Sequence, residues 1–232
     1  MGYFYGFDIY YFLLVVPALI IAIIAQTKVK STYKKYSSVL NSRGLTGASA
    51  AQAVLSYYGI TDVTIQPIAG TLTDNFNPKT KVISLSQGVY ASNSVAAIGI
   101  ACHEAGHAAQ HAQDYAPIKI RNSIVPFCNI GSFAGIPLAI LGLILSWSSL
   151  VYIGIALYGL VFVFHLVTLP VEFNASNRAL KVIADNGLLY GDEYSGAKKV
   201  LASAAMTYVA SMLMSLANLL RFAIRLLGSS RR

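Results

Sequence analysis

The stretch IYYFLLVVPALIIAIIA, residues Ile9–Ala25, decides the class of fold, because its 17 residues carry no charge. About 20 predominantly apolar helical residues cross the hydrocarbon core of a bilayer, so this run can span with little tilt. The composition agrees, since 56% of the residues are apolar and only 11% are charged, against roughly 25% charged residues in soluble domains. We therefore expect a protein whose partner is a lipid bilayer.

The positive charges follow this run instead of preceding it. Lys28 is the first basic residue, and the cluster continues with Lys30, Lys34, Lys35 and Arg43. A secretory signal peptide carries its positive charges before the apolar core, so that alternative is disfavoured. Segments rich in Lys and Arg stay on the cytoplasmic side. This rule predicts an outside N-terminus and a chain that enters the cytoplasm near residue 27.

Neither the net charge nor the cysteines indicate another class of protein. The net charge is +8, but nucleic-acid binding uses basic residues mixed with aromatic ones on a soluble face. Here the basic residues flank apolar segments, so we expect no nucleic-acid partner. The two cysteines, Cys102 and Cys128, do not make a disulfide framework. Cys102 adjoins a histidine, but consecutive helical residues point about 100° apart, so it is interpreted as a buried core residue.

Two further apolar segments follow, Ile124–Trp147 and Leu150–Leu169. Their connector, Ser148–Ser149, is short and uncharged, which predicts an antiparallel transmembrane hairpin. Basic residues lie before and after the pair, so both ends are expected on the cytoplasmic side. These residues are Lys119, Arg121, Arg178 and Lys181.

A last apolar segment, Leu201–Leu220, is followed by Arg221, Arg225, Arg231 and Arg232. If it crossed the membrane, four arginines would lie outside. If it folded back as a core or interfacial helix, all 17 basic residues would share one side. The folded-back form is favoured, and the crossing form stays open because orientation bias has exceptions.

The stretch between residues 28 and 120 reads as mixed α and β. Thr46 predicts the N-cap of a helix that Gly59 ends. Val63–Ile68 and Lys81–Leu85 have strand composition, and residues 74–78, DNFNP, have turn composition. A helix is expected from about Ser94 to Gln113. We further expect an exposed edge strand at residues 81–86, to which an extended substrate would add as another strand.

Residues 103–107, His-Glu-Ala-Gly-His, form a HExxH motif inside that last helix. Two histidines at positions i and i+4 lie one above the other, so both imidazoles can reach one tetrahedral zinc ion. Glu104 is then placed beside the open coordination position, where it can accept a proton from a metal-activated water. A helix as apolar as this one has few reasons to bury these groups without a metal.

A third ligand is needed, and Glu172 is the best candidate. It is one of only three glutamates, lies at the end of the predicted hairpin, and has no basic neighbour before Arg178. A carboxylate in such a place needs a cation. His111 is eight residues after His103, about 12 Å along a helix, and therefore too far to share the zinc.

Two other roles are less defined. His165 lies inside an apolar segment, where an ionisable side chain is a functional candidate, but it lies about 10 Å from Glu172 along a helix. It is interpreted as an interhelical hydrogen-bonding residue. Tyr208 and Arg178 are candidates for stabilising the oxyanion.

Together these blocks resemble the YugP-type neutral zinc metallopeptidases of bacterial membranes. The similarity covers essentially the full length and rests on Lys28–Thr32, Ser42–Gly47, Leu72–Asp74, the HEAGH motif and Leu169–Leu180. It implies a zinc peptidase with metal ligands His103, His107 and Glu172, and with Glu104 as the catalytic base.

The chain is more distantly similar to the gluzincin pattern of HtpX-type membrane proteases. That pattern places an Asp four residues after the Glu ligand to orient the first histidine, and this chain has Ser176 there. The hydroxyl can do the same work more weakly, or Asn174 or Asn177 can replace it.

The expected fold is an α-rich α+β membrane protein with a minigluzincin-like zinc lobe. Residues 1–27 would form an N-terminal transmembrane helix, 28–120 a cytoplasmic catalytic lobe, 121–170 the transmembrane hairpin, and 171–232 the third-ligand segment and C-terminal helices.

The expected function is that of a zinc-dependent endopeptidase of the bacterial cell (inner) membrane, with one Zn²⁺ per chain. It would act on protein or peptide substrates, and membrane-protein partners or a homo-oligomer stay open. The rival hypothesis is a zinc-stabilised scaffold or adaptor without turnover. An intact Glu104 argues against this rival, because a structural zinc site needs no base.

Overall fold

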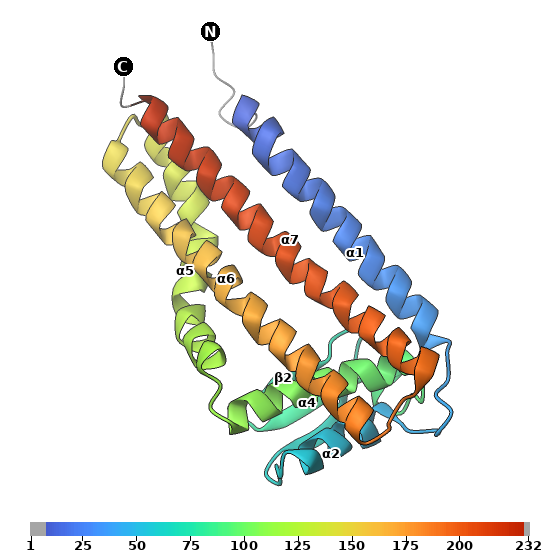
Figure 1. The fold of residues 1–232 in the computed structure, drawn as a ribbon. Helices are drawn as coiled ribbons and strands as arrows, with labels where there is room; N and C mark the ends of the chain where they lie inside the picture. Colours follow the sequence, from blue (N-terminus) through green and yellow to red (C-terminus); the bar gives the residue numbers. More distant parts are fainter. Residues whose placement is uncertain (1–7, 230–232) are drawn as a thin grey trace. The chain divides into compact units, whose positions relative to one another are not determined.

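The structure is a computed structural model that describes residues 8–229 (Figure 1). Helices dominate it and one small sheet accompanies them, which confirms the predicted α-rich α+β class. In chain order the elements are η1 (Tyr11–Val15), α1 (Val16–Ser37), α2 (Gly47–Tyr57), β1 (Thr64–Ile68), β2 (Asn75–Asn77), β3 (Val82–Ser86), α3 (Gln87–Tyr90), α4 (Val95–Ala112), α5 (Ala116–Ile144), α6 (Ser148–Asp185) and α7 (Gly191–Ser229). The first seven residues of the predicted N-terminal segment, and Arg231 and Arg232, lie outside the described residues.

Within residues 8–229, four helical stretches are long and apolar enough to cross a membrane: Tyr11–Ser37, Ala116–Ile144, Ser148–Asp185 and Gly191–Arg225. The third stretch contains the predicted span Leu150–Leu169, and the first two overlap most of the predicted spans Ile9–Ala25 and Ile124–Trp147. Leu201–Leu220 lies in the middle of α7, so by length and composition this segment also qualifies as a span.

The connection between α5 and α6 differs from the prediction. The serines at 148 and 149 do not form the turn, because α6 begins at Ser148, and the connection consists of residues 145–147. Ser146 adopts a positive φ of 51° there. The carbonyl oxygen of Trp147, just before the helix, accepts hydrogen bonds from the backbone N–H groups of Leu150 and Val151. The helix also continues through Pro170 to Asp185, so the hairpin segment and the segment carrying Glu172 are parts of one helix.

The chain divides into two compact units. Unit 1 comprises Met1–Gln26, Lys119–Leu169 and Thr207–Arg232, and unit 2 comprises Thr27–Ile118 and Pro170–Met206. In unit 1, α5 and α6 pack closely through glycines, since a Cβ at Gly154 would lie 2.4 Å from the backbone nitrogen of Ala139. Small residues of this kind let transmembrane helices approach each other.

Unit 2 holds a three-stranded sheet in the order β1-β3-β2. β1 pairs with β3 in parallel and β2 pairs with β3 antiparallel, so that Ile65 and Phe76 both lie opposite Ile83. The strand at 82–86 is therefore central, and the prediction that it is an exposed edge is wrong. The turn predicted at 74–78 is also wrong in part, because β2 lies there. Pairing with β3 outweighs the turn preference of its two asparagines.

Thr46 and Gly59 bound α2 as the sequence predicted, and the structure shows a further cap at Ser94. The Thr46 hydroxyl accepts a hydrogen bond from the backbone N–H of Ser49 and caps α2. Gly59 follows that helix with a φ of 66°. Ser94 caps α4 by accepting from the N–H of Ala97. These caps fix where α4 begins and hence which of its residues face the core.

Candidate metal centre

Helix α4 is buried on most of its surface, and its small residues make this possible. Ala101, Cys102, Ala105 and Ala109 are fully buried in the core of unit 2. Cys102 lies 3.8 Å from the carbonyl oxygen of Ala50, which confirms that it is a core residue and not a ligand. The buried residues leave one stripe of α4, the stripe with His103 and His107, to face the C-terminal part of α6.

A glycine between the two histidines sets how closely the helices approach. A Cβ at Gly106 would lie only 2.6 Å from the carbonyl oxygen of Ala175 on α6. Atoms cannot approach this closely without displacement, so only glycine permits this packing. The close contact carries both histidines up to the side chain of Glu172.

Three ligand atoms converge where these helices meet. The Oε2 atom of Glu172 lies 3.3 Å from Nε2 of His103 and 3.5 Å from Nε2 of His107. All three atoms lie within 4.8 Å of one another. In a tetrahedral zinc site with bonds of 2.0–2.1 Å, ligand atoms are about 3.3 Å apart. The observed spacing and the donor set of two imidazoles and one carboxylate therefore fit a zinc ion.

The group is shielded from solvent. The Glu172 side chain is 3% exposed, and those of His103 and His107 are 14% and 11% exposed. A carboxylate buried at this depth is costly unless positive charge compensates it. A metal ion held by all three residues would provide that compensation. The sequence prediction of Glu172 as a ligand rested on the same argument. In the structure the Glu172 carboxylate lies beside the two histidines of the motif.

The outward-facing nitrogen of each histidine has a partner. Nδ1 of His103 lies 3.1 Å from Oγ of Ser176, so the hydroxyl occupies the orienting position that the wider gluzincin pattern gives to Asp. Nδ1 of His107 lies 3.0 Å from Oε1 of Gln110. Partners of this kind fix the orientation of a histidine that binds a metal.

Sequence reasoning missed Gln110. Its side chain is fully buried, and its Nε2 donates to the carbonyl oxygen of Val171 at 2.7 Å and to Oδ1 of Asn174 at 3.0 Å. The available signal was its position three residues after His107, which places both side chains on one face of α4. Asn174 therefore acts on Gln110 and not directly on His103.

Glu104 follows His103 and lies within electrostatic reach of the whole group. Burial raises the pKa of its carboxyl group, and the neighbouring His103 and His107 partly offset this increase. The negative charges of Glu172 and Asp74 also raise it. A raised pKa brings a carboxylate closer to the range in which it can both accept and release a proton.

Asp74 lies just before β2, in one of the blocks that carry the family resemblance. Its carboxylate accepts hydrogen bonds from the backbone N–H of Ser86 at 2.8 Å and from the Ser86 hydroxyl. Burial raises the pKa of Asp74, and the bonds from Ser86 counteract this increase. Asp74 thus ties the start of β2 to the end of β3, within electrostatic reach of Glu104.

The remaining candidates lie elsewhere. His111 is exposed, with its ring centroid 6.2 Å from that of Phe76, and it does not belong to the metal group. Arg178 donates to Asn174 at 2.7 Å and also to Gln113, so it braces the α4–α6 contact. His165 and Tyr208 belong to unit 1, whereas the three ligands belong to unit 2.

Comparisons with known proteins agree with this chemistry. The profile of the family described as "Putative neutral zinc metallopeptidase" matches residues 11–227. A relative from Bacillus subtilis (strain 168), described as "Putative membrane protease YugP", is 44% identical over 209 residues, which is 90% of this chain and 93% of the relative. No solved structure gives a significant match. The family profile covers nearly the whole chain. This protein therefore belongs to the neutral zinc metallopeptidase family, as the resemblance of its sequence blocks indicated.

Proposed function

We propose that this protein is a membrane-embedded endopeptidase that binds one zinc ion per chain and hydrolyses peptide bonds. His103, His107 and Glu172 would hold the metal, and Glu104 would be the general base. The observation that carries the proposal is the convergence of two imidazole nitrogens and one carboxylate oxygen, with separations of 3.3 Å and 3.5 Å at a buried position. The family match and the printed name of the Bacillus relative support the same activity.

A zinc ion at this site would supply Lewis-acid chemistry, which polarises a carbonyl group and lowers the pKa of a water molecule. Glu104 would accept the proton of the attacking water and deliver it to the nitrogen of the departing amine. Its raised pKa suits both steps, because the carboxyl group must hold the proton between them. The helix positions Glu104 one residue from a ligand, so the base would need no large motion to reach the water.

An extended substrate can pair only with an edge strand of the sheet, and β3 is the central strand. The edges of the sheet are β1 and β2. β2 is the edge associated with α4, since Phe76 packs edge-on against His111. We assign the pairing with an extended substrate to β2, where strand addition would place the peptide alongside the helix that carries the motif.

The proposed location is the bacterial cell (inner) membrane, crossed several times, with the zinc site on the cytoplasmic side. The apolar helices support the membrane location, as does the printed name of the relative. The basic cluster that begins at Lys28 supports the orientation, because Lys- and Arg-rich segments remain cytoplasmic.

Substitution of the base separates this proposal from the scaffold hypothesis. Glu104→Gln keeps the shape of the side chain but cannot accept a proton, so cleavage of a protein substrate such as casein should fall by about 10²–10⁴-fold. Zinc content should stay near one ion per chain, as measured on the purified protein. Glu193→Gln is the matched control, because it removes the one glutamate outside the site and should leave both quantities unchanged.

Three results would contradict the proposal. Loss of zinc in Glu104→Gln would make Glu104 a ligand, and undiminished cleavage would mean that another group activates the water. Absence of cleavage by the parent protein with full zinc would favour the scaffold. The ligand assignment is tested separately, since His103→Ala, His107→Ala and Glu172→Ala should each lose zinc while His111→Ala keeps it.

A further inference from the structure

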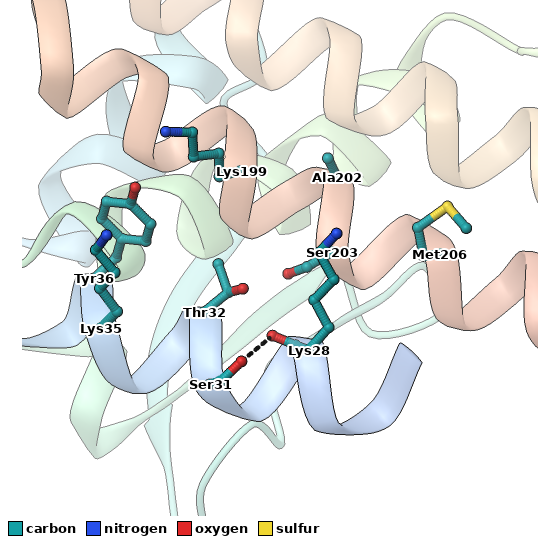
Figure 2. A pocket seen from close by; sticks show the side chains of 9 residues that line it. All are labelled: Lys28, Ser31, Thr32, Lys35, Tyr36, Lys199, Ala202, Ser203 and Met206. Carbon is teal, nitrogen blue, oxygen red and sulfur yellow. Dashed lines mark hydrogen bonds between the residues drawn. The ribbon is translucent and has the colours of Figure 1, made fainter. Parts of the chain in front are cut away.

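A pocket of about 510 Å³ lies between α1 and α7 within unit 2 (Figure 2). On α1 it is lined by positions 28, 31, 32, 35 and 36, and on α7 by positions 199, 202, 203 and 206. Both sets follow the i, i+3, i+4, i+7 spacing of a single helix face. Figure 2 shows that the helices are antiparallel here, with Lys199 towards Tyr36 and Met206 towards Lys28.

The charge of this pocket is entirely positive. Lys28, Lys35 and Lys199 contribute three ammonium groups, and no Asp or Glu lines the pocket. Within residues 8–229, none of these three lysines forms an ion pair. Like charges around one cavity repel each other, and a bound anion would relieve the repulsion. The positive charge of the pocket therefore favours an anionic ligand.

The hydroxyl groups in the pocket leave the ammonium groups as its main donors. Ser31 Oγ donates to the carbonyl oxygen of Lys28 at 3.0 Å, and Ser203 Oγ donates to that of Val200 at 2.7 Å. Both protons are thus used within their own helices. Thr32 lies between the two lysines of α1 on the same face and offers a further hydroxyl. The Tyr36 hydroxyl also lines the pocket. Three cations and two hydroxyl groups are donors that a phosphate group can use.

Apolar surface continues from this pocket along α1. Moving towards the N-terminus in steps of four residues, Thr32 and Lys28 are followed by Ile24 and Ile20, which are 59% and 52% exposed. Both isoleucines lie in the apolar stretch that qualifies as a membrane span. On the other wall, Met206 is also exposed. A ligand that fits this surface has an anionic head and apolar chains.

We propose that this pocket binds the headgroup phosphate of an anionic phospholipid, with the acyl chains lying along the exposed isoleucines of α1. This inference goes beyond the proteolytic function and does not depend on it.

The test measures binding of dioctanoyl phosphatidylglycerol to the full chain in a neutral detergent by native mass spectrometry. The variant Lys28→Gln, Lys35→Gln, Lys199→Gln removes the three pocket charges. Each lysine near a lipid surface contributes about a fivefold change in binding, so the triple variant should bind roughly 100-fold more weakly. The matched control, Lys30→Gln, Lys34→Gln, Lys198→Gln, removes the same charge from the same helices outside the pocket and should change binding by no more than about threefold.

A neutral substitution gives a second measurement. Ala202→Trp fills the pocket without changing its charge and should also weaken binding. Equal weakening by the two lysine triples would overturn the proposal, because surface charge alone would explain it. Equal binding of dioctanoyl phosphatidylcholine would overturn the requirement for an anion. Equal binding of glycerol phosphate would overturn the proposal that the ligand is a lipid, because a phosphate ester without acyl chains would then suffice.

Discussion

Oε1 of Gln110 lies 3.0 Å from Nδ1 of His107, and this contact determines which nitrogen of the histidine is free for a metal. The amide nitrogen of Gln110 donates to the carbonyl oxygen of Val171, which can only accept. The amide is therefore oriented with its oxygen towards His107. That oxygen requires a proton on Nδ1, which leaves the lone pair of Nε2 directed at Glu172.

Replacing Gln110 should weaken zinc binding without touching a ligand. Gln110→Met keeps a similar shape but cannot accept the proton of His107, and it leaves the carbonyl oxygen of Val171 without this donor. Loss of such an orienting partner typically costs 10- to 100-fold in metal affinity. We expect that increase in the dissociation constant for zinc, measured by competition with a chelator.

The control for this substitution is Gln113→Met, three residues further along the chain. Gln113 is exposed and contacts Arg178 instead of a histidine, so its zinc affinity should remain that of the parent. An unchanged affinity in Gln110→Met would show that the tautomer of His107 is set in another way. The cost in folding free energy, about 1–3 kcal/mol for an unsatisfied buried group, can be measured separately by denaturation.

Gly106 should be irreplaceable by alanine, whereas Gly99 on the same helix should tolerate it. An added Cβ at Gly106 would lie 2.6 Å from the backbone oxygen of Ala175, but at Gly99 the nearest atom is the Ala197 Cβ at 3.4 Å. Overpacking costs about 1–3 kcal/mol or more, while alanine in a helix gains up to about 1 kcal/mol over glycine. Gly106→Ala should therefore unfold at lower denaturant concentration and lose zinc.

The same measurements on Gly99→Ala should give parent-like zinc content and equal or higher stability. Matched behaviour of the two variants would contradict the close α4–α6 approach described here. The comparison is sharp because both glycines lie in α4 and both substitutions add one methyl group.

The sequence predicted the parts of this site that depend on local spacing. The pair His103 and His107 followed from the helical period, and the helix itself was expected from about Ser94 to Gln113. Glu172 could be predicted because so few glutamates exist. Gln110 could not, because its role arises from a backbone oxygen on a helix 61 residues away in sequence. The central position of β3 and the existence of β2 likewise depend on strand pairing between distant segments, which local composition does not encode.

Zinc affinity should depend on pH near neutrality. In the metal-free site, burial by itself would lower the pKa of His107, but the hydrogen bond with Glu172 and the charges of Glu104 and Glu172 raise it overall. A proton on this histidine must leave before zinc can bind. The apparent affinity should therefore fall as the pH falls through this raised pKa, which lies above the ordinary 6.5, and lose about tenfold per pH unit below it.

Chelator competition between pH 5.5 and pH 8, corrected for titration of the chelator, would measure this dependence. His111→Ala should show the same pH profile as the parent, because its ring does not belong to the metal group. A constant affinity from pH 8 down to pH 6.5 would contradict the raised pKa of His107.

The contacts within unit 1 favour a crossing α7 over the folded-back segment that charge bias suggested. Asp8 precedes the first span, and its carboxylate lies 3.2 Å from Nε of Arg221 and 2.9 Å from Nη1 of Arg225. Close by, Val15 and Ala18 pack with Ala217. The C-terminal part of α7 therefore lies along the N-terminal part of α1 (Figure 1). Since the Lys28 end of α1 is expected in the cytoplasm, Arg221 and Arg225 would be on the opposite side.

A negative charge beside the two arginines makes this exception to the orientation rule tolerable. The Arg221 side chain is only 8% exposed, and Asp8 places a negative charge beside both arginines. Removing one partner of a buried pair costs about 3–5 kcal/mol, so Asp8→Asn should lower the yield of folded protein.

The decisive measurement of the topology is labelling of single cysteines by a membrane-impermeant reagent in intact cells. Ser229→Cys, at the last residue of α7, should be accessible, and Lys34→Cys should be protected until the cells are opened. The two native cysteines are buried and should give little background. Protection of both positions in intact cells would mean that α7 does not cross and that the arginines share the cytoplasmic side with the lysines.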